Sequence, residues 1–191
     1  MLKREDLLSL EAYHRARPEL RAKVIAHKKL RNVPLGLNAS LHFEDETTMR
    51  YQIQEMVRLE RMYEPELIQE ELDVYNPLIP DGANWKATLM IEYPDVDERK
   101  EALGKLMGFE QAVWMQVGDY QRVRPIANED LDRTTAEKTS AVHFLRFELT
   151  PDMVAAAKAG AAIKAGVDHP NYATELTLPQ ATRDSLAQDL K

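Results

Sequence analysis

The chain has 191 residues, of which 44% are hydrophobic and 30% are charged. This composition is typical of one globular domain and excludes a disordered, collagen-like or coiled-coil protein. No cysteine is present, which excludes disulfides, thiolate zinc sites and cysteine nucleophiles, and leaves oxygen and imidazole groups as the only ligands for a metal. The first ten residues are too charged for a signal peptide, and no stretch of 18 apolar residues occurs. We therefore expect a cytoplasmic protein that makes no contact with a membrane.

The first part of the chain predicts helices that flank one strand. Two helices over 4–15 and 18–31, separated near Pro18, predict an N-terminal helical hairpin. Apolar residues then alternate with polar ones over 35–43, which predicts a strand with Leu37, Leu41 and Phe43 buried on one side. Helical spacing returns over 46–63 and from Pro65 to Tyr75.

The second part alternates between strands and helices without a strict βαβ order. The expected elements are a strand over 86–93, a helix over 97–110, a hairpin over 112–126 that turns at Gly118-Asp119, a polar loop over 127–141, a strand over 141–149, a helix from Thr150 and Pro151 to about Gly166, a strand over 167–178 and a closing helix from Pro179. Hairpins with intervening helices favour an antiparallel or mixed sheet over a doubly wound fold.

These elements predict an α+β fold with a sheet of about five or six strands and helices packed on it. No internal repeat or long linker divides the chain. We therefore predict a single domain over residues 1–191, made of a helical hairpin (1–31) and an α+β body (32–191).

Charge is distributed unevenly along the chain. Residues 1–40 contain nine Lys or Arg and four acids, whereas residues 41–191 contain sixteen and twenty-eight. The cations gather at 15–31, where they are able to bind phosphate groups of a polyanion. An apolar stripe that includes Leu20 and Val24 favours a simpler interpretation, in which the cations form the solvated face of an amphipathic helix. No aromatic residue lies among them to stack on bases, so nucleic-acid binding is the weaker interpretation.

Three glutamates fall on the apolar stripes of predicted helices, namely Glu55, Glu60 and Glu71. A buried carboxylate is costly unless it is paired, hydrogen-bonded or bound to a metal. Pairing with Arg58, Arg61 or Tyr63 is the favoured explanation, and a metal site is the alternative.

Three histidines are candidates for chemistry. His42 shares a strand face with Ser40 and Glu44, and these groups suit a hard metal. His143 points with the apolar residues of its strand, where a histidine bonded to a carbonyl group is the common finding. His169 follows Asp168 and precedes Pro170, so the carboxylate is placed to orient the imidazole for metal binding or general-base catalysis, or else to cap a turn.

The chain also resembles a known family in five sequence strings. They are FEDETTMRYQIQEMVRLE (43–60), QEELDVYNPLIPDG (69–82), ATLMIEYPD (87–95), TSAVHFLRFEL (139–149) and VDHPNY (167–172). They resemble an uncharacterised bacterial family, catalogued as domain of unknown function 3501, over nearly the whole chain. The strings contain Tyr51, Glu55, His143, Asp168 and His169, and the resemblance assigns none of them a role.

The resemblance implies partners rather than a mechanism. Members of the family are often encoded beside a rubrerythrin-like di-iron protein and a cysteine-rich iron–sulfur protein, which implies a role in peroxide defence or electron transfer. The leading hypothesis is therefore an accessory protein in oxidative stress, with a possible site for a divalent transition metal such as iron at His42, Glu55, His143 or His169.

Two alternatives remain open. One is an enzyme in which His169 and Asp168 form the acid–base pair, with His143 and Tyr51 as further catalytic candidates. The other is a polyanion-binding module that uses the basic N-terminal helix. The sequence contains no GxGxxG, Walker A, GxSxG or HExxH motif, which argues against the dinucleotide-binding, P-loop, α/β-hydrolase and common zinc-protease classes.

Overall fold

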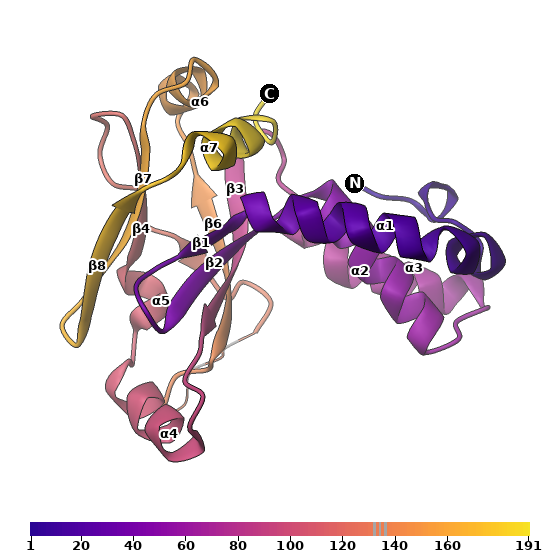
Figure 1. Ribbon diagram of the computed structural model, residues 1–191, viewed down its shortest axis with the longest axis horizontal. Coiled ribbons are helices and arrows are strands. Elements are labelled where there is room, and N and C mark those ends of the chain that lie inside the picture. The colour runs from indigo at the N-terminus through magenta and orange to yellow at the C-terminus, as the bar shows by residue number, and fades with distance from the viewer. Residues whose placement is uncertain (132, 134, 136) are drawn as a thin grey trace.

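The computed structural model describes residues 1–191 except 132, 134 and 136. It consists of a body, in which two antiparallel sheets pack face to face, and a helical arm that projects from one side of the body (Figure 1). The α+β class and the antiparallel pairing are confirmed. The strands are divided between two sheets, however, where the sequence predicted one.

The first sheet has five strands in the order β1-β2-β3-β6-β5, and the second has three in the order β4-β7-β8. The strands are β1 (Asn32–Pro34), β2 (Ala39–Glu44), β3 (Asn84–Ile91), β4 (Val113–Val117), β5 (Ile126–Ala127), β6 (Val142–Glu148), β7 (Ile163–His169) and β8 (Tyr172–Thr177). Each pairing is antiparallel.

The main hydrophobic core lies between the two sheets. Leu41, Leu89 and Phe147 from the five-stranded sheet belong to one buried cluster with Met115 and Ala165 from the three-stranded sheet. Alternation along the strands produces this arrangement, because every second side chain of a strand points to the same face.

Helices close the ends of this sandwich (Figure 1). Helices α6 (Pro151–Lys158) and α7 (Gln180–Ala187) lie at one end, and α4 (Val96–Lys105) lies at the other, followed by the short α5 (Phe109–Ala112). The Thr150 side chain accepts a hydrogen bond from the N–H of Met153, and Pro151 occupies the first helical turn. These are the start signals from which α6 was predicted.

The arm is built from the N-terminal segment and two later helices. It contains η1 (Arg4–Asp6), α1 (Leu10–Leu30), α2 (Glu46–Leu59), α3 (Pro65–Tyr75) and η2 (Asn76–Leu78). A second, separate cluster of buried residues, Leu2, Ile53, Val57, Met62 and Leu72, holds these segments together. The arm is thus larger than the expected hairpin and has a core of its own.

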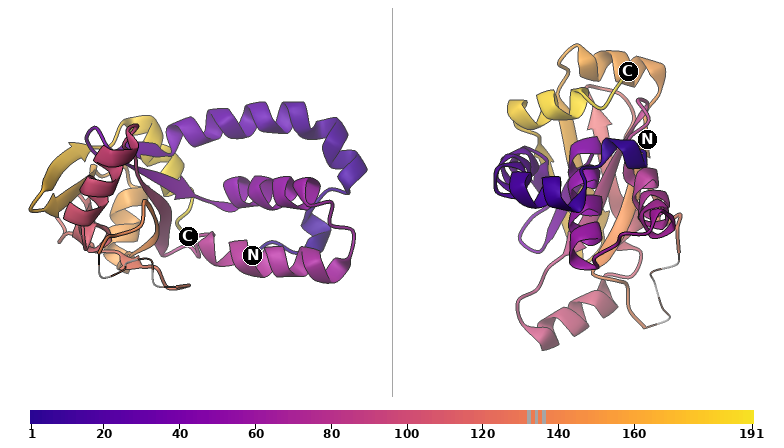
Figure 2. Two further views of the ribbon diagram at one scale, coloured as in Figure 1. Left: turned by 90° about the horizontal axis from the view of Figure 1, so that it is seen from below. Right: turned by 90° about the vertical axis from the view of Figure 1, so that its right-hand side faces the viewer.

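The N-terminal hairpin is a correction to the sequence analysis. One continuous helix, α1, replaces the two helices expected on either side of Pro18. Proline removes one helical hydrogen bond and bends a helix without always ending it, and α1 bends in its first half (Figure 2). Packing of Tyr13 and Val24, which are both buried, holds the two halves of α1 on the same arm.

The strand expected over 35–43 is also corrected. The chain turns at Gly36, whose φ is +74°, so β1 and β2 form a hairpin instead of one strand. Leu41 and Phe43 are buried as predicted, but Leu37 lies in the turn and is 97% exposed. The hydroxyl group of Tyr172 donates to the carbonyl of Leu35 and fills the space where a Cβ of residue 36 would lie.

The remaining differences concern the three-stranded sheet. The helix expected to reach Gly166 ends at Lys158, and residues 163–177 form the hairpin β7–β8 instead of a single strand. The hairpin expected over 112–126 is reduced to one bridge between Met115 and Val123, and the long pairing of β4 is with β7. The loop expected over 127–141 contains residues 132, 134 and 136, which lie outside the described residues. Among the described helices, none has the length and apolar character needed to cross a membrane.

Candidate functional site

The arm contains a carboxylate that is surrounded by donors. Glu55 on α2 receives two hydrogen bonds from Arg17, at 2.7 and 2.9 Å, and two from Arg58, at 3.1 and 3.3 Å. The hydroxyl group of Tyr13 donates to the same carboxylate at 2.7 Å. The predicted pairing of Glu55 with Arg58 is confirmed, and Arg17 and Tyr13 are partners that the sequence did not reveal.

This cluster is built for stability. The hydrogen bond from Arg17, more than any other contact, lowers the pKa of Glu55 to about 2. Burial and the hydrogen bond to Glu55 raise the pKa of Tyr13, and the nearby Tyr51 raises it further. A carboxylate with so many donors has no free lone pair directed at a ligand. Glu55 therefore ties α1 to α2 through Tyr13 and Arg17. The catalytic candidate Tyr51 lies near this cluster on α2.

His143 on β6 is fully buried, and both of its ring nitrogens are engaged. Nδ1 accepts from the side-chain amide of Asn128 at 2.9 Å, so Nε2 carries the proton and faces the Ser140 carbonyl at 3.0 Å and the Thr139 hydroxyl at 2.9 Å. Burial lowers the pKa of His143 more than the nearby Glu110 carboxylate raises it. The ring is a neutral histidine that links β6 to the preceding loop.

Asp168 lies on the outer face of the three-stranded sheet, in a network of donors. Trp114 Nε1 donates to it at 2.9 Å, and Arg122 and Arg124 donate at 3.2 and 2.5 Å. Partial burial opposes ionisation, but the hydrogen bonds and charges of these partners outweigh it and lower the pKa of Asp168. The Arg122 guanidinium also stacks on the Trp114 ring, 3.7 Å from its centroid.

His169, the next residue on β7, points to the opposite face of the strand. Its Nδ1 accepts from the N–H of Asn171 at 3.2 Å, and Nε2 faces the carbonyl of Met107 at 3.0 Å. Because Asp168 belongs to the outer face, it does not orient the imidazole. The strand predicted over 167–178 already implied this separation, since neighbours in a strand alternate between faces.

His42 is half-buried on β2, where its Nε2 lies 2.9 Å from the Ser40 hydroxyl. Burial lowers the pKa of His42. The predicted shared face of Ser40, His42 and Glu44 is present, but Glu44 accepts from the hydroxyl groups of Thr48 and Thr88. This carboxylate joins α2 to the sheet and does not approach the imidazole as a second metal ligand.

The candidate metal ligands thus occupy four different places. Glu55 lies in the arm and His169 in the three-stranded sheet, while His42 and His143 point to opposite faces of the five-stranded sheet. Within the described part of the chain, no group of three or more His, Asp or Glu side chains is arranged to hold a metal ion. These residues do not fit a histidine–carboxylate iron site.

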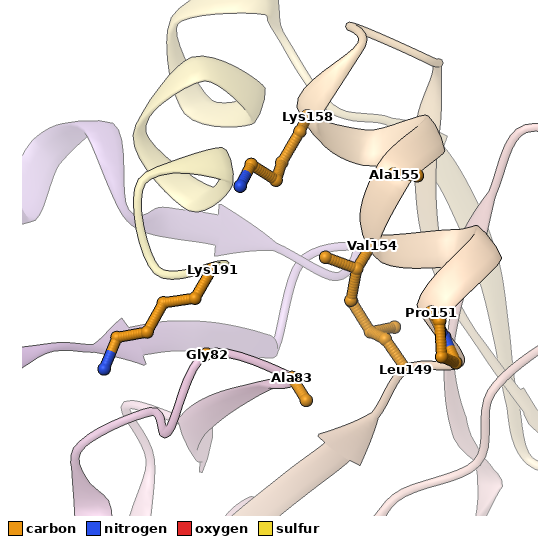
Figure 3. Close-up of a pocket in the computed structure, with 8 residues that line it drawn as sticks. All are labelled: Gly82, Ala83, Leu149, Pro151, Val154, Ala155, Lys158 and Lys191. Atoms are coloured by element: carbon orange, nitrogen blue, oxygen red, sulfur yellow. The ribbon is translucent and has the colours of Figure 1, made fainter.

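A hollow of about 550 Å³ lies beside α6 (Figure 3). Lys158 and Lys191 extend along one side of it, and Leu149 and Val154 lie on the other. Such a lining suits a small anion with an apolar part. The described residues form no ion pair with either lysine, and no hydrogen bond fixes the ammonium groups in position. The hollow therefore provides charge without a fixed binding geometry.

The joint between arm and body is the main feature that the sequence analysis missed. Arg31, only 1% exposed, follows α1 and donates to the carbonyls of Phe43, Glu44 and Ser185. It also pairs with Asp189 at 2.5 Å. Burial raises the pKa of Asp189 to about 6, although Arg31 acts in the opposite direction. The sequence did not reveal Arg31, because it lies in a basic segment in which no pattern distinguishes one buried cation from its solvated neighbours.

The free end of the arm carries exposed apolar side chains. The start of α1 and the connection between α2 and α3 lie together at this end (Figure 2). Leu8, Leu59 and Tyr63 are 43%, 60% and 72% exposed there. We call these three residues the arm tip. All three are exposed apolar side chains on the segments that meet at this end of the arm.

Comparison with known proteins agrees with this fold. The model of a family described as protein of unknown function (DUF3501) matches residues 1–190. A protein of unknown function from Burkholderia pseudomallei K96243, with a crystal structure at 1.90 Å resolution, is similar to the chain. The two are 52% identical, with a TM-score of 0.94 over 100% of this chain and 99% of that one. No curated protein matches the chain.

Proposed function

The chain belongs to the DUF3501 family, and from this premise we propose that it is an accessory protein of bacterial oxidative-stress or electron-transfer metabolism. In this role it binds a rubrerythrin-like di-iron protein and a cysteine-rich iron–sulfur protein, the partners that the family resemblance implies. The redox groups belong to the partners, and this chain contributes the surface that brings them together.

The observation that carries the proposal is the exposed arm tip. Leu59 and Tyr63 are more than half exposed, and tyrosine is one of the residue types that contribute most to the binding energy of protein interfaces. The separate core of the arm holds the tip away from the body, where a partner can reach it. A rigid, preformed surface loses less conformational entropy on binding than a mobile one.

The geometry supports binding better than the proposed acid–base enzyme. Asp168 and His169 face opposite sides of β7, and both nitrogens of His169 face backbone groups. A general base needs a free nitrogen within hydrogen-bond distance of its substrate. A second function for the His169 pair is therefore not proposed.

The test measures binding of the purified full chain to each purified partner by isothermal titration calorimetry. The double variant L59S/Y63S removes the two most exposed of the three apolar side chains of the arm tip. We expect it to raise the Kd at least tenfold, because one truncated central side chain commonly costs that much. Leu37→Ser is the matched control, since Leu37 is 97% exposed but lies on the body.

Two results would contradict the proposal. One is that the unaltered chain binds neither partner at concentrations up to about 100 µM. Such a result would mean a Kd weaker than that of specific transient complexes. The other is that L59S/Y63S leaves binding unchanged while Leu37→Ser weakens it. That result would mean that the binding surface lies on the body.

A further inference from the structure

The solvent-facing side of α1 combines small apolar residues with cations. We call this side the α1 outer face: Pro18, Arg21, Ala22, Ile25, Lys28 and Lys29. Ile25 is 42% exposed, and a shallow hollow of about 590 Å³ lies over the face. Helix α1 contains six Lys or Arg and two acids. The buried Tyr13 and Val24 lie on the side of α1 that packs on α2. The outer face lies beside that side, because Arg21 and Lys28 are three and four residues from Val24.

The solvent-facing side of α3 has the same design with the opposite charge. We call it the α3 outer face: Glu66, Leu67, Glu70, Asp73 and Val74. Leu67 and Val74, seven residues apart, are 41% and 63% exposed and form an apolar stripe. Acids lie beside this stripe, and α3 contains four acids and no Lys or Arg.

Neither face is neutralised by the residues that the structure describes. Among the described residues, no ion pair involves Arg21, Lys28 or Lys29 on α1, or Glu66 or Glu70 on α3. Helix α2 lies between α1 and α3 (Figure 2), so it separates the basic face of α1 from the acidic face of α3. They cannot meet in one molecule.

We propose that the α1 outer face of one copy binds the α3 outer face of a second copy of this chain. Both faces are helical, both have an apolar stripe, and the charges beside the stripes are complementary. Such a contact is heterologous, because it joins two different surfaces. Each bound copy therefore still offers one free basic face and one free acidic face, and copies add head to tail until a ring closes or a filament grows.

The contact is salt-sensitive by its nature. Exposed ion pairs contribute little individually and are screened by salt, so the apolar stripes supply affinity while the charges select the partner face. This inference concerns the sides of the arm and does not depend on the proposed function, which concerns the arm tip. Purified chain alone tests it, so failure of one proposal is distinguishable from failure of the other.

The experiment is sedimentation velocity of the full chain at about 10 to 200 µM, a range suited to weak association. We expect the weight-average mass to rise with concentration at about 50 mM salt and to fall at about 500 mM, where screening is strong. K28E/K29E makes both faces acidic, and E66K/E70K makes both faces basic. Each variant alone should stay monomeric at every concentration.

Mixing the two variants provides the decisive measurement. An equimolar mixture again offers basic faces to acidic ones, so association should return to at least the level of the unaltered chain. K100E/K158E is the control, because it changes the net charge as much as K28E/K29E but alters only the exposed surface of the body. It should associate like the unaltered chain.

Three results would overturn the inference. One is a chain that is monomeric at all concentrations in low salt. Another is a mixture of the two variants that stays monomeric. The last concerns a different occupant: if a single-stranded oligonucleotide binds the unaltered chain with a Kd below about 1 µM at physiological salt, and K28E/K29E abolishes that binding, the α1 outer face is a polyanion site.

Discussion

Replacement of Arg31 by methionine should destabilise the protein strongly. Methionine preserves most of the volume of the side chain and removes the guanidinium group. That group is 1% exposed and donates to three backbone carbonyls, to the Ser185 hydroxyl and to Asp189. All of these acceptors lose a partner in R31M, and Asp189 becomes a buried carboxylate without its cation.

The expected cost follows from these contacts. Loss of one partner of a buried ion pair costs about 3 to 5 kcal/mol, because the remaining charge is left uncompensated. Each orphaned buried acceptor adds about 1 to 3 kcal/mol unless water replaces the donor. We expect the free energy of unfolding to fall by about 4 kcal/mol, which is a large fraction of the 5 to 15 kcal/mol typical of a folded protein.

Urea denaturation followed by circular dichroism measures this loss. Arg50→Met is the matched control, because Arg50 forms an exposed i,i+4 pair with Glu46 and should cost about 0.5 kcal/mol or less. Addition of Asp189→Asn to R31M should recover part of the stability, because it removes the unpaired charge. A loss below about 1 kcal/mol in R31M would refute the reasoning, since it would mean that the desolvation of Arg31 cancels its contacts.

Three further predictions concern acid titration and close packing. The pKa of Asp189 in the folded chain is about 6 against an ordinary 3.8. Its stabilising contribution is therefore complete below pH 3.8 and is lost as the pH rises through 6. Urea titrations from about pH 4 to 7 should show the free energy of unfolding falling over this range, and Asp189→Asn should abolish the fall. Glu55 acts in the opposite sense: its pKa is about 2 against 4.5, so its contribution is complete above pH 4.5 and is lost toward pH 2, and Glu55→Gln should flatten the acid side of the stability profile. Gly166→Ala should lower the free energy of unfolding by about 1 to 3 kcal/mol or more, because the new Cβ would lie 2.3 Å from the Trp114 ring. In the control Gly104→Ala in α4, the new Cβ meets no atom closer than 3.6 Å, and the change should stabilise the helix by about 0.5 to 1 kcal/mol. Equal stabilities of the two alanine variants, or a pH profile that either acid variant leaves unchanged, would contradict the corresponding prediction.

The elements that the sequence predicted well have local start and stop signals. Helix α3 begins at Pro65 and ends at Tyr75 as predicted, and α6 begins at its Thr-Pro signal. The errors arise where distant contacts decide the structure. Tyr172, on another sheet, packs on the turn at Gly36, and no local pattern reveals this contact. Division of the strands into two sheets depends likewise on pairing between segments far apart in the chain.

The candidate site shows the same limit. An apolar stripe was enough to predict a partner for Glu55, and Arg58 lies on the same helix at i,i+3. Arg17 and Tyr13 come from α1, which packs beside α2 only in the folded chain. His42, His143 and His169 all lie on strands, as predicted. The expectation that Asp168 orients His169 was wrong, because neighbours in a strand point to opposite faces. The solvated cations of α1 were predicted from the sequence, and Arg21, Lys28 and Lys29 are exposed. The arm tip and the α3 outer face were not predicted, because exposure depends on what the rest of the chain leaves uncovered.

The two hydrophobic cores share no buried residue, and this separation affects how the molecule unfolds. A cluster as small as that of the arm stabilises less than the core between the sheets, so the arm can open and close while the sandwich stays intact. Amide hydrogens of α2 and α3 would then exchange with solvent through this partial opening, and those of β3 and β6 only through global unfolding. The protein would behave as two cooperative units joined at Arg31, and the surfaces presented to other molecules would belong to the less stable unit.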